Sequence, residues 1–136
     1  TATMFMRPQG PKMSRRERIE HWAAILERHG GPLNALREIE YLPANERRAA
    51  GGCNTPLTIA FNDPVLREEG LKGDRLGDAM EFFGLNDGEA HRLLCDCHYL
   101  GNMTGKLVAK RLRRHMEIAE SRSRMRHMIG RIFGFA

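Results

Sequence analysis

Residues 74–115 decide the fold and read DRLGDAMEFFGLNDGEAHRLLCDCHYLGNMTGKLVAKRLRRH. Apolar side chains recur in this stretch at spacings of three and four, which is the spacing of one face of an α-helix. Gly84 ends the first run, because a glycine after the last turn adopts the left-handed conformation at little cost. A second turn is expected at residues 100–103. The stretch therefore predicts three short helices separated by two turns.

Each of these helices is expected to begin at a polar capping residue. Asp74 is placed to cap the first helix, and Thr104 is placed to cap the third. Asn86, with Glu89 three residues later, resembles a capping box for the second helix. The apolar positions expected to face the core are Leu76, Ala79, Met80, Phe82, Phe83, Ala90, Leu93, Leu94, Cys97, Leu107, Val108, Ala109 and Leu112.

The second helix contains the one candidate metal site. On a helix over about residues 87–99, His91, Cys95 and His98 fall at i, i+4 and i+7 and share a face. Imidazole and thiolate are zinc ligands, but structural zinc sites usually take a second ligand pair from another segment. The other cysteine and histidine positions form no such pair. We therefore expect no cofactor and half-exposed histidines, with metal binding by these three residues as the alternative.

The second helix, the glycine-containing turn and the third helix together resemble part of a helix-turn-helix. The similarity rests on the pattern Thr-x-x-x-Val-Ala-x-x-Leu, which begins at Thr104 and ends at Leu112. No clean recognition helix follows directly. The resemblance implies contact with nucleic acid.

Positive charge is concentrated at one end of the chain. Residues 106–136 contain nine Lys or Arg and two Glu, a net charge of +7, so the remainder of the chain carries −2. Arginine suits phosphate and guanine edges because its planar guanidinium donates two parallel hydrogen bonds. The residues expected to bind nucleic-acid phosphates are Lys106, Lys110, Arg111, Arg113, Arg114, Arg122, Arg124 and Arg126.

Residues 116–136 are expected to form a basic amphipathic arm. Its apolar positions recur at spacings of three and four and are Met125, Met128, Ile129, Ile132 and Phe133. Three roles fit such a helix. The first is packing on its own domain or on a second copy of the chain. The second is binding along nucleic-acid phosphates. The third is binding to an anionic membrane surface or in the groove of a partner protein.

The chain before the central stretch predicts further helices after a flexible leader at residues 1–13. Ser14 and Glu17 form a capping box for a helix in which Trp22 is a core anchor. A helix is expected at residues 32–42. Residues 57–61, LTIAF, fit either a short helix or a strand, and another short helix is expected after Asp63.

These elements predict an all-α, single-domain bundle of about five to seven short helices. A chain of 136 residues, 41% hydrophobic and rich in helix-forming residues, suits one small helical domain. We expect residues 14–115 to form that domain and residues 116–136 the arm. Three cysteines without disulfide spacing favour a reduced, cytoplasmic protein, and no run is long enough to span a membrane.

The sequence favours a regulatory protein over an enzyme. It contains no phosphate loop, no nucleophile elbow and no metalloprotease motif. The basic end and the partial helix-turn-helix favour nucleic acid as the partner. The alternative is a non-enzymatic adaptor that dimerises, or binds a protein partner, through its methionine-rich C-terminal helix.

Overall fold

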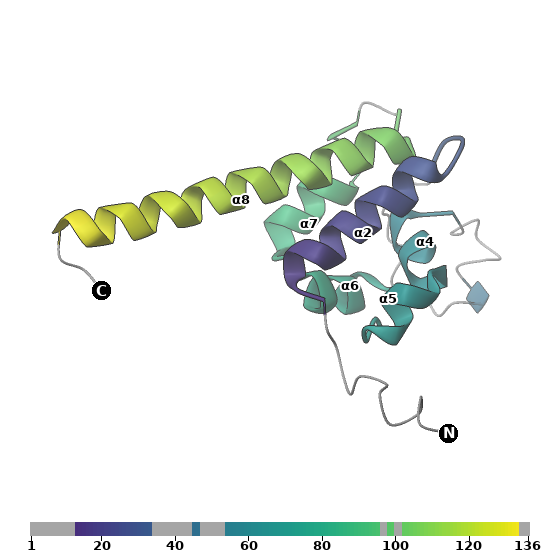
Figure 1. Ribbon diagram of the computed structural model, residues 1–136. Helices are drawn as coiled ribbons and strands as arrows, with labels where there is room; N and C mark the ends of the chain where they lie inside the picture. The colour runs from purple at the N-terminus through teal and green to yellow at the C-terminus, as the bar shows by residue number, and fades with distance from the viewer. Residues whose placement is uncertain (1–12, 34–44, 47–53, 96–97, 100–101, 134–136) are drawn as a thin grey trace, which may run out of the picture.

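The computed structural model describes residues 13–33, 45–46, 54–95, 98–99 and 102–133, and these contain six helices and no strand (Figure 1). The all-α prediction is therefore confirmed for the described residues. Five of the helices are short and the sixth has 29 residues. In chain order they are α2 (Arg15–Arg28), α4 (Pro56–Asn62), α5 (Pro64–Glu68), α6 (Leu76–Phe83), α7 (Asp87–Leu94) and α8 (Gly105–Phe133).

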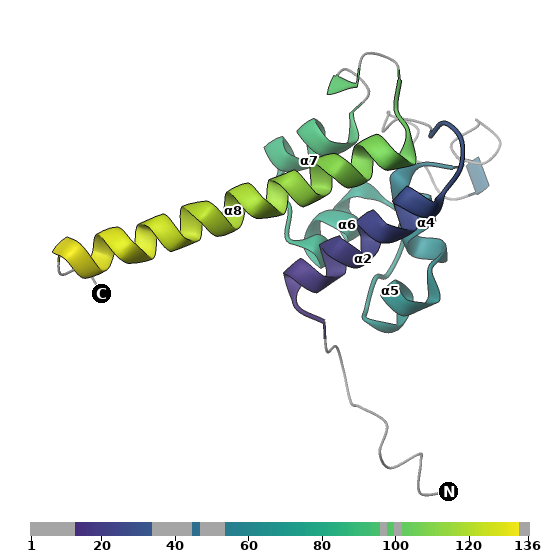
Figure 2. The same cartoon turned by 45° about the horizontal axis from the view of Figure 1, so that its top comes forward.

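Helix α2 and the first half of α8 lie side by side, and the shorter helices pack around them (Figures 1 and 2). The predicted capping box at the start of α2 is present, since Ser14 and Glu17 each bond the other's backbone N–H. From α2, Ile19 and Leu26 are fully buried, as is Leu112 of α8. Apolar side chains spaced at three and four along both helices thus form one shared core.

Trp22 joins three helices at the centre of this core and is completely buried. Its ring stacks on Phe83 of α6 with the centroids 4.1 Å apart and the planes 13° from parallel. Its indole Nε1–H donates to the carbonyl oxygen of Pro56, 3.0 Å away at the start of α4. The predicted core anchor is confirmed, and its single polar atom is satisfied as a buried indole requires.

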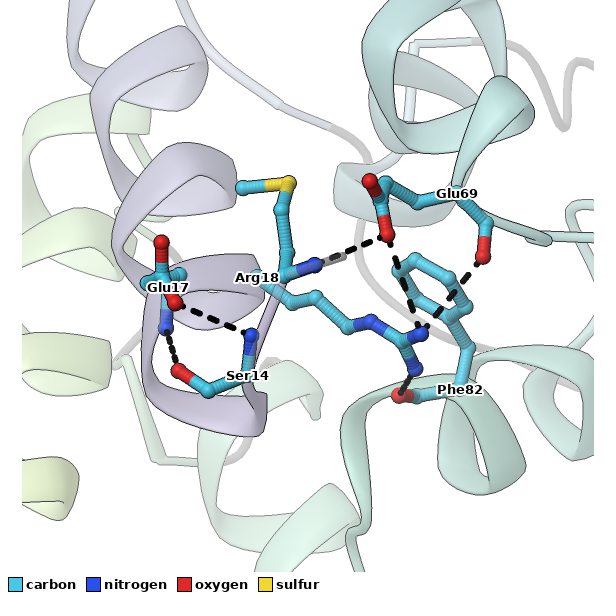
Figure 3. Close-up of polar contacts among 6 residues, drawn as sticks. Ser14, Glu17, Arg18, Glu69 and Phe82 are labelled. Carbon is cyan, nitrogen blue, oxygen red and sulfur yellow. Dashed lines mark hydrogen bonds and ion pairs between the residues drawn. The ribbon is translucent and has the colours of Figure 1, made fainter. Parts of the chain in front are cut away.

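Arg18 makes a second link from α2, at the edge of the core (Figure 3). One guanidinium nitrogen donates to the carbonyl oxygen of Phe82 at 3.0 Å, and the guanidinium lies 4.2 Å from the centroid of the Phe82 ring. Another nitrogen lies 4.0 Å from the carboxylate of Glu69, which also accepts a bond from the backbone N–H of Met13. Arg18 thereby fixes α2 against both α6 and the residues after α5.

The capping predictions were mostly right. Asn86 and Glu89 form the expected capping box of α7, and the Thr104 hydroxyl accepts from the backbone N–H of Leu107 at 3.2 Å. Asp74 is not the cap of α6, because the helix begins one residue later with Arg75 at the N-cap and no side-chain cap bond. Gly84 ends α6 in the predicted left-handed conformation, with φ of 66°.

The two readings of residues 57–61 are resolved in favour of a helix. Thr55 and Thr58 form a capping box, and Pro56 occupies the first turn of α4, where its missing N–H costs nothing. Asp63 then caps α5 through the backbone N–H of Leu66. The flexible leader and most of the helix expected at residues 32–42 fall outside the described residues, and so does Cys97.

Helix α8 is continuous where the sequence predicted two separate helices. It runs without interruption through residues 115 and 116, because no glycine or proline breaks the chain there. Figures 1 and 2 show its C-terminal half extending away from the other helices. The division into a domain at residues 14–115 and an arm at 116–136 stays a prediction.

Gly105 permits the close approach of α2 and α8. A Cβ atom at this position would overlap the backbone carbonyl oxygen of Leu26 and would lie 3.2 Å from that of His29. These are backbone atoms at the end of α2 and cannot rotate away. Nearby, the backbone N–H of Leu33 donates to the carbonyl oxygen of Met103 at 2.9 Å, which joins the chain segments leaving α2 and entering α8.

We expect Gly105→Ala to lower the free energy of unfolding by about 3 kcal/mol, because α2 and α8 must separate to admit the methyl group. Gly77→Ala, in α6, is the matched control. Its Cβ meets no atom within 4 Å, so a gain of roughly 0.5 kcal/mol is expected from helix propensity. Urea unfolding followed by circular dichroism measures both, and equal effects of the two substitutions would contradict the close approach.

Candidate functional site

A groove of about 430 Å³ lies between α7 and the middle of α8. Its walls come from α7, from His98 in the segment that follows α7, and from residues 111–122 of α8. Its charged and polar lining consists of Glu89, Arg92, His98, Arg111, Arg114, His115 and Arg122. Three of the eight predicted phosphate-binding residues therefore meet here, together with an arginine that the sequence analysis did not single out.

Arg111 is held in position by the segment that follows α7. Its guanidinium lies 3.9 Å from the centroid of the Tyr99 ring and donates to the carbonyl oxygen of His98. Tyr99 is itself fixed, since it is 3% exposed and its hydroxyl donates to the carbonyl oxygen of Leu93. Burial raises the pKa of Tyr99 to about 12 despite the opposing charge of Arg111, so the hydroxyl remains a donor.

The other three groove arginines have no ion pair with any described acidic residue. Arg114 and Arg122 are exposed, and Arg92 donates only to the carbonyl oxygen of Gly88 one turn earlier, at 3.4 Å. Among the described lining residues the single acid is Glu89, whose carboxylate lies 3.3 Å from Nε2 of His115. The described residues of this groove therefore carry more positive than negative charge.

His115 forms the partly buried wall of the groove, with its side chain 12% exposed. Burial lowers its pKa from the ordinary value near 6.5, and the charges of Arg15, Arg92 and Arg122 lower it further. Glu89 acts in the opposite direction, more strongly than any one of these arginines but less strongly than burial. The imidazole is therefore neutral around pH 7, and Arg15 places a guanidinium nitrogen 3.4 Å from Nε2.

Because the folded protein binds the His115 proton less readily than the unfolded chain, protonation favours unfolding. We expect the free energy of unfolding to fall as the pH drops from about 7 through the ordinary histidine range, and the loss to continue down to the lowered pKa of His115. His115→Gln should flatten this part of the profile. Chemical denaturation at a series of pH values measures the slope, and identical slopes in the two proteins would refute the burial effect.

The remaining predicted cations do not join the groove. Arg113 faces α2, where it pairs with Glu20 at 2.9 Å and with Glu27 at 2.8 Å. Those bonds raise the pKa of Arg113 and leave it committed to the α2–α8 contact. Arg124 bonds Ser121 and lies 3.9 Å from Glu120. Exposed positions elsewhere around α8 are occupied by Lys106, Lys110 and Arg126.

The premise of the candidate metal site was wrong in one respect. Helix α7 ends at Leu94 with Cys95 as its C-cap, so His91, Cys95 and His98 do not lie along one helix face. The rings of His91 and His98 nevertheless meet edge to face, with centroids 4.9 Å apart. Among the described residues no group of three or more His, Cys, Asp or Glu side chains is placed to hold a metal ion.

The connection between α7 and α8 differs from the predicted helix-turn-helix. Because α7 ends early, residues 95–104 separate the two helices. The turn of a helix-turn-helix usually has three or four residues. Two described residues of this connection contact α8: the Tyr99 ring packs against the guanidinium of Arg111, and Thr104 caps the first turn.

An apolar stripe runs along the exposed part of α8. Its members lie at spacings of three, four and seven on one side of the helix and are Ile118, Met125, Met128, Ile129 and Ile132. Their exposed fractions range from 41% to 69%, so no other described part of the chain covers them. Packing back on the domain, one of the roles considered for this helix, is therefore not seen in the described structure.

Sequence reasoning missed Arg92 and the role of His115 in the groove. Arg92 adjoins the predicted core position Leu93, and nothing in its spacing distinguishes it from an ordinary solvated arginine. Its meeting with Arg114 and Arg122 depends on how α7 lies against α8, which is a tertiary property. The only sign of the groove in the sequence was the concentration of Lys and Arg after residue 105. It indicated the cations on the α8 wall but not Arg92 on the α7 wall.

No protein-family model, no curated protein and no solved structure matches this chain. None of the described helices has the length and apolar character required to cross a membrane. The fold and the two surfaces, a groove rich in arginine and an exposed apolar stripe, are therefore the basis for a functional proposal.

Proposed function

We propose that this chain is an interaction module that binds a protein partner through the exposed end of α8. The observation that carries the proposal is the apolar stripe, whose five large side chains are more than two-fifths exposed. Soluble monomers rarely leave contiguous apolar patches uncovered unless the patch binds something. Two of the five are methionines, whose flexible thioether side chains adapt to a partner's surface.

The charges beside the stripe favour an acidic amphipathic helix as the partner. Residues 121–133, here called the free end of α8, contain four arginines and no acidic residue. Two copies of this segment would bring eight arginines together without a counter-charge, and like charges across an interface are unfavourable. A helix with an apolar face and glutamates along its edges would bury the stripe and pair with the arginines.

We expect Ile129→Glu in the full chain to weaken binding of an acidic amphipathic peptide at least tenfold, because a charge would be buried in the stripe. The probe is a synthetic helix with leucines on one face and glutamates beside them. Ser123→Glu is the matched control, since it adds the same charge to the same helix on another side. Fluorescence anisotropy of the labelled peptide measures both affinities.

Equal weakening by the two substitutions would mean that charge alone drives the association, and the stripe would not be the docking surface. Sedimentation of the wild-type chain as a dimer, abolished by Ile129→Glu, would assign the stripe to a second copy instead. Binding to anionic vesicles in preference to the peptide would assign it to a membrane surface. Each of these results contradicts an acidic protein partner.

Nucleic acid is a second candidate partner, favoured by the exposed cations of α8. Replacing Arg124 and Arg126 together by Gln should reduce the slope of log affinity against log salt by roughly two on duplex DNA, since each phosphate contact contributes about 0.9. Arg28→Gln, at the far end of α2, should leave the slope unchanged. Titrations of random duplex DNA and RNA at four salt concentrations measure the slope, and salt-independent affinity would remove this candidate.

A further inference from the structure

We propose that the groove between α7 and α8 binds a phosphate ester. The proposal does not depend on the partner assigned to the apolar stripe. Arginine donates two parallel hydrogen bonds to a phosphate, and charge-assisted bonds of this kind are about twice as strong as neutral ones. The groove presents four arginines from two helices around one space, which is the arrangement that phosphate recognition uses.

The charge balance of the groove lacks a negative partner. Arg92, Arg111, Arg114 and Arg122 supply four positive charges, and among the described lining residues Glu89 supplies the one negative charge. That carboxylate lies 3.3 Å from Nε2 of His115, whose neutral ring does not alter the excess of positive over negative charge among these residues. Like charges held close together repel, so an anion that bound between the guanidinium groups would relieve the repulsion as well as form hydrogen bonds.

The groove also has room for more than an inorganic ion. Its volume of about 430 Å³ falls in the range of small-molecule sites, which extends from about 300 to 1,000 Å³. Leu93, Ile118 and Ala119 form an apolar wall beside the arginines. A ligand with a phosphate for the arginines and a flat or apolar organic part for this wall would fill both halves of the groove.

One of the four arginines is positioned before any ligand arrives. Arg111 lies on the Tyr99 ring and donates to the carbonyl oxygen of His98, so part of its conformational freedom is already lost. A donor fixed in this way loses less entropy on binding. Arg114 and Arg122 are exposed and would close over the phosphate from α8.

The pKa of His115 is expected to change when an anion binds in the groove. Its neighbours with charge are Glu89, Arg15, Arg92 and Arg122. A phosphate beside these arginines would oppose their effect and raise the pKa of His115 toward its ordinary value. The shift is a readout that general surface binding of an anion would not produce.

The test uses the full chain and three probes, namely inorganic pyrophosphate, adenosine monophosphate and a twelve-nucleotide single strand of DNA. Calorimetry measures affinity, and proton NMR follows the His115 ring through a pH titration with and without each probe. We expect the phosphate ester to bind and to raise the pKa of His115. Arg122→Gln and Arg114→Gln should each weaken binding about tenfold, whereas Arg28→Gln, at the exposed end of α2 and outside the groove, should not.

The comparison of probes identifies the source of the phosphate. Tight binding of adenosine monophosphate, with the strand no better, supports a free nucleotide. Preference for the strand, with the same loss in Arg122→Gln, supports a nucleic-acid backbone in the groove. The proposal is overturned if no probe binds, if inorganic pyrophosphate binds as well as adenosine monophosphate, or if Arg28→Gln weakens binding as much as Arg122→Gln. Ile129→Glu should leave these affinities unchanged, which separates failure of the groove from failure of the stripe.

Discussion

The contact between α2 and the first half of α8 is the constraint on which the rest of the structure depends. Gly105 lets the start of α8 lie against the backbone at the end of α2, where any side chain would collide with Leu26. Farther along, Arg113 pairs with Glu20 and Glu27 and fixes the rotation of α8 about its own axis. With that rotation set, Arg111 and Arg114 face α7. The apolar stripe continues the same side of α8 beyond the groove, since it begins at Ile118, seven residues after Arg111.

Much of the fold could be predicted from the sequence because its signals are local. Capping boxes at Ser14 and Asn86 and the left-handed Gly84 act within a few residues, and periodic apolar positions identified the buried faces. The errors arose where local signals compete. Asp74 has capping chemistry, yet α6 begins after Arg75, and no breaker separates the two helices predicted within α8.

The groove could be predicted only in part, because it is formed by tertiary contact. The cations of α8 were visible as an uneven charge distribution, but their roles diverge in the structure. Arg113 has acidic partners on α2, whereas Arg114, one residue later and about 100° around the helix, has none among the described residues. Spacing along one helix cannot separate these roles, since each depends on which neighbouring helix lies opposite.

Helix α8 therefore contributes residues to two surfaces, the groove and the apolar stripe. The first half of α8 packs against α2, and its charged side chains face either α2 or the groove. The apolar side chains of its free end are not covered by other described residues. Ile118 belongs to both surfaces, because it lines the groove and begins the apolar stripe. A ligand in the groove and a partner on the stripe would meet at this residue. Occupancy of one surface would then alter the affinity of the other, since shared contacts couple binding sites reciprocally.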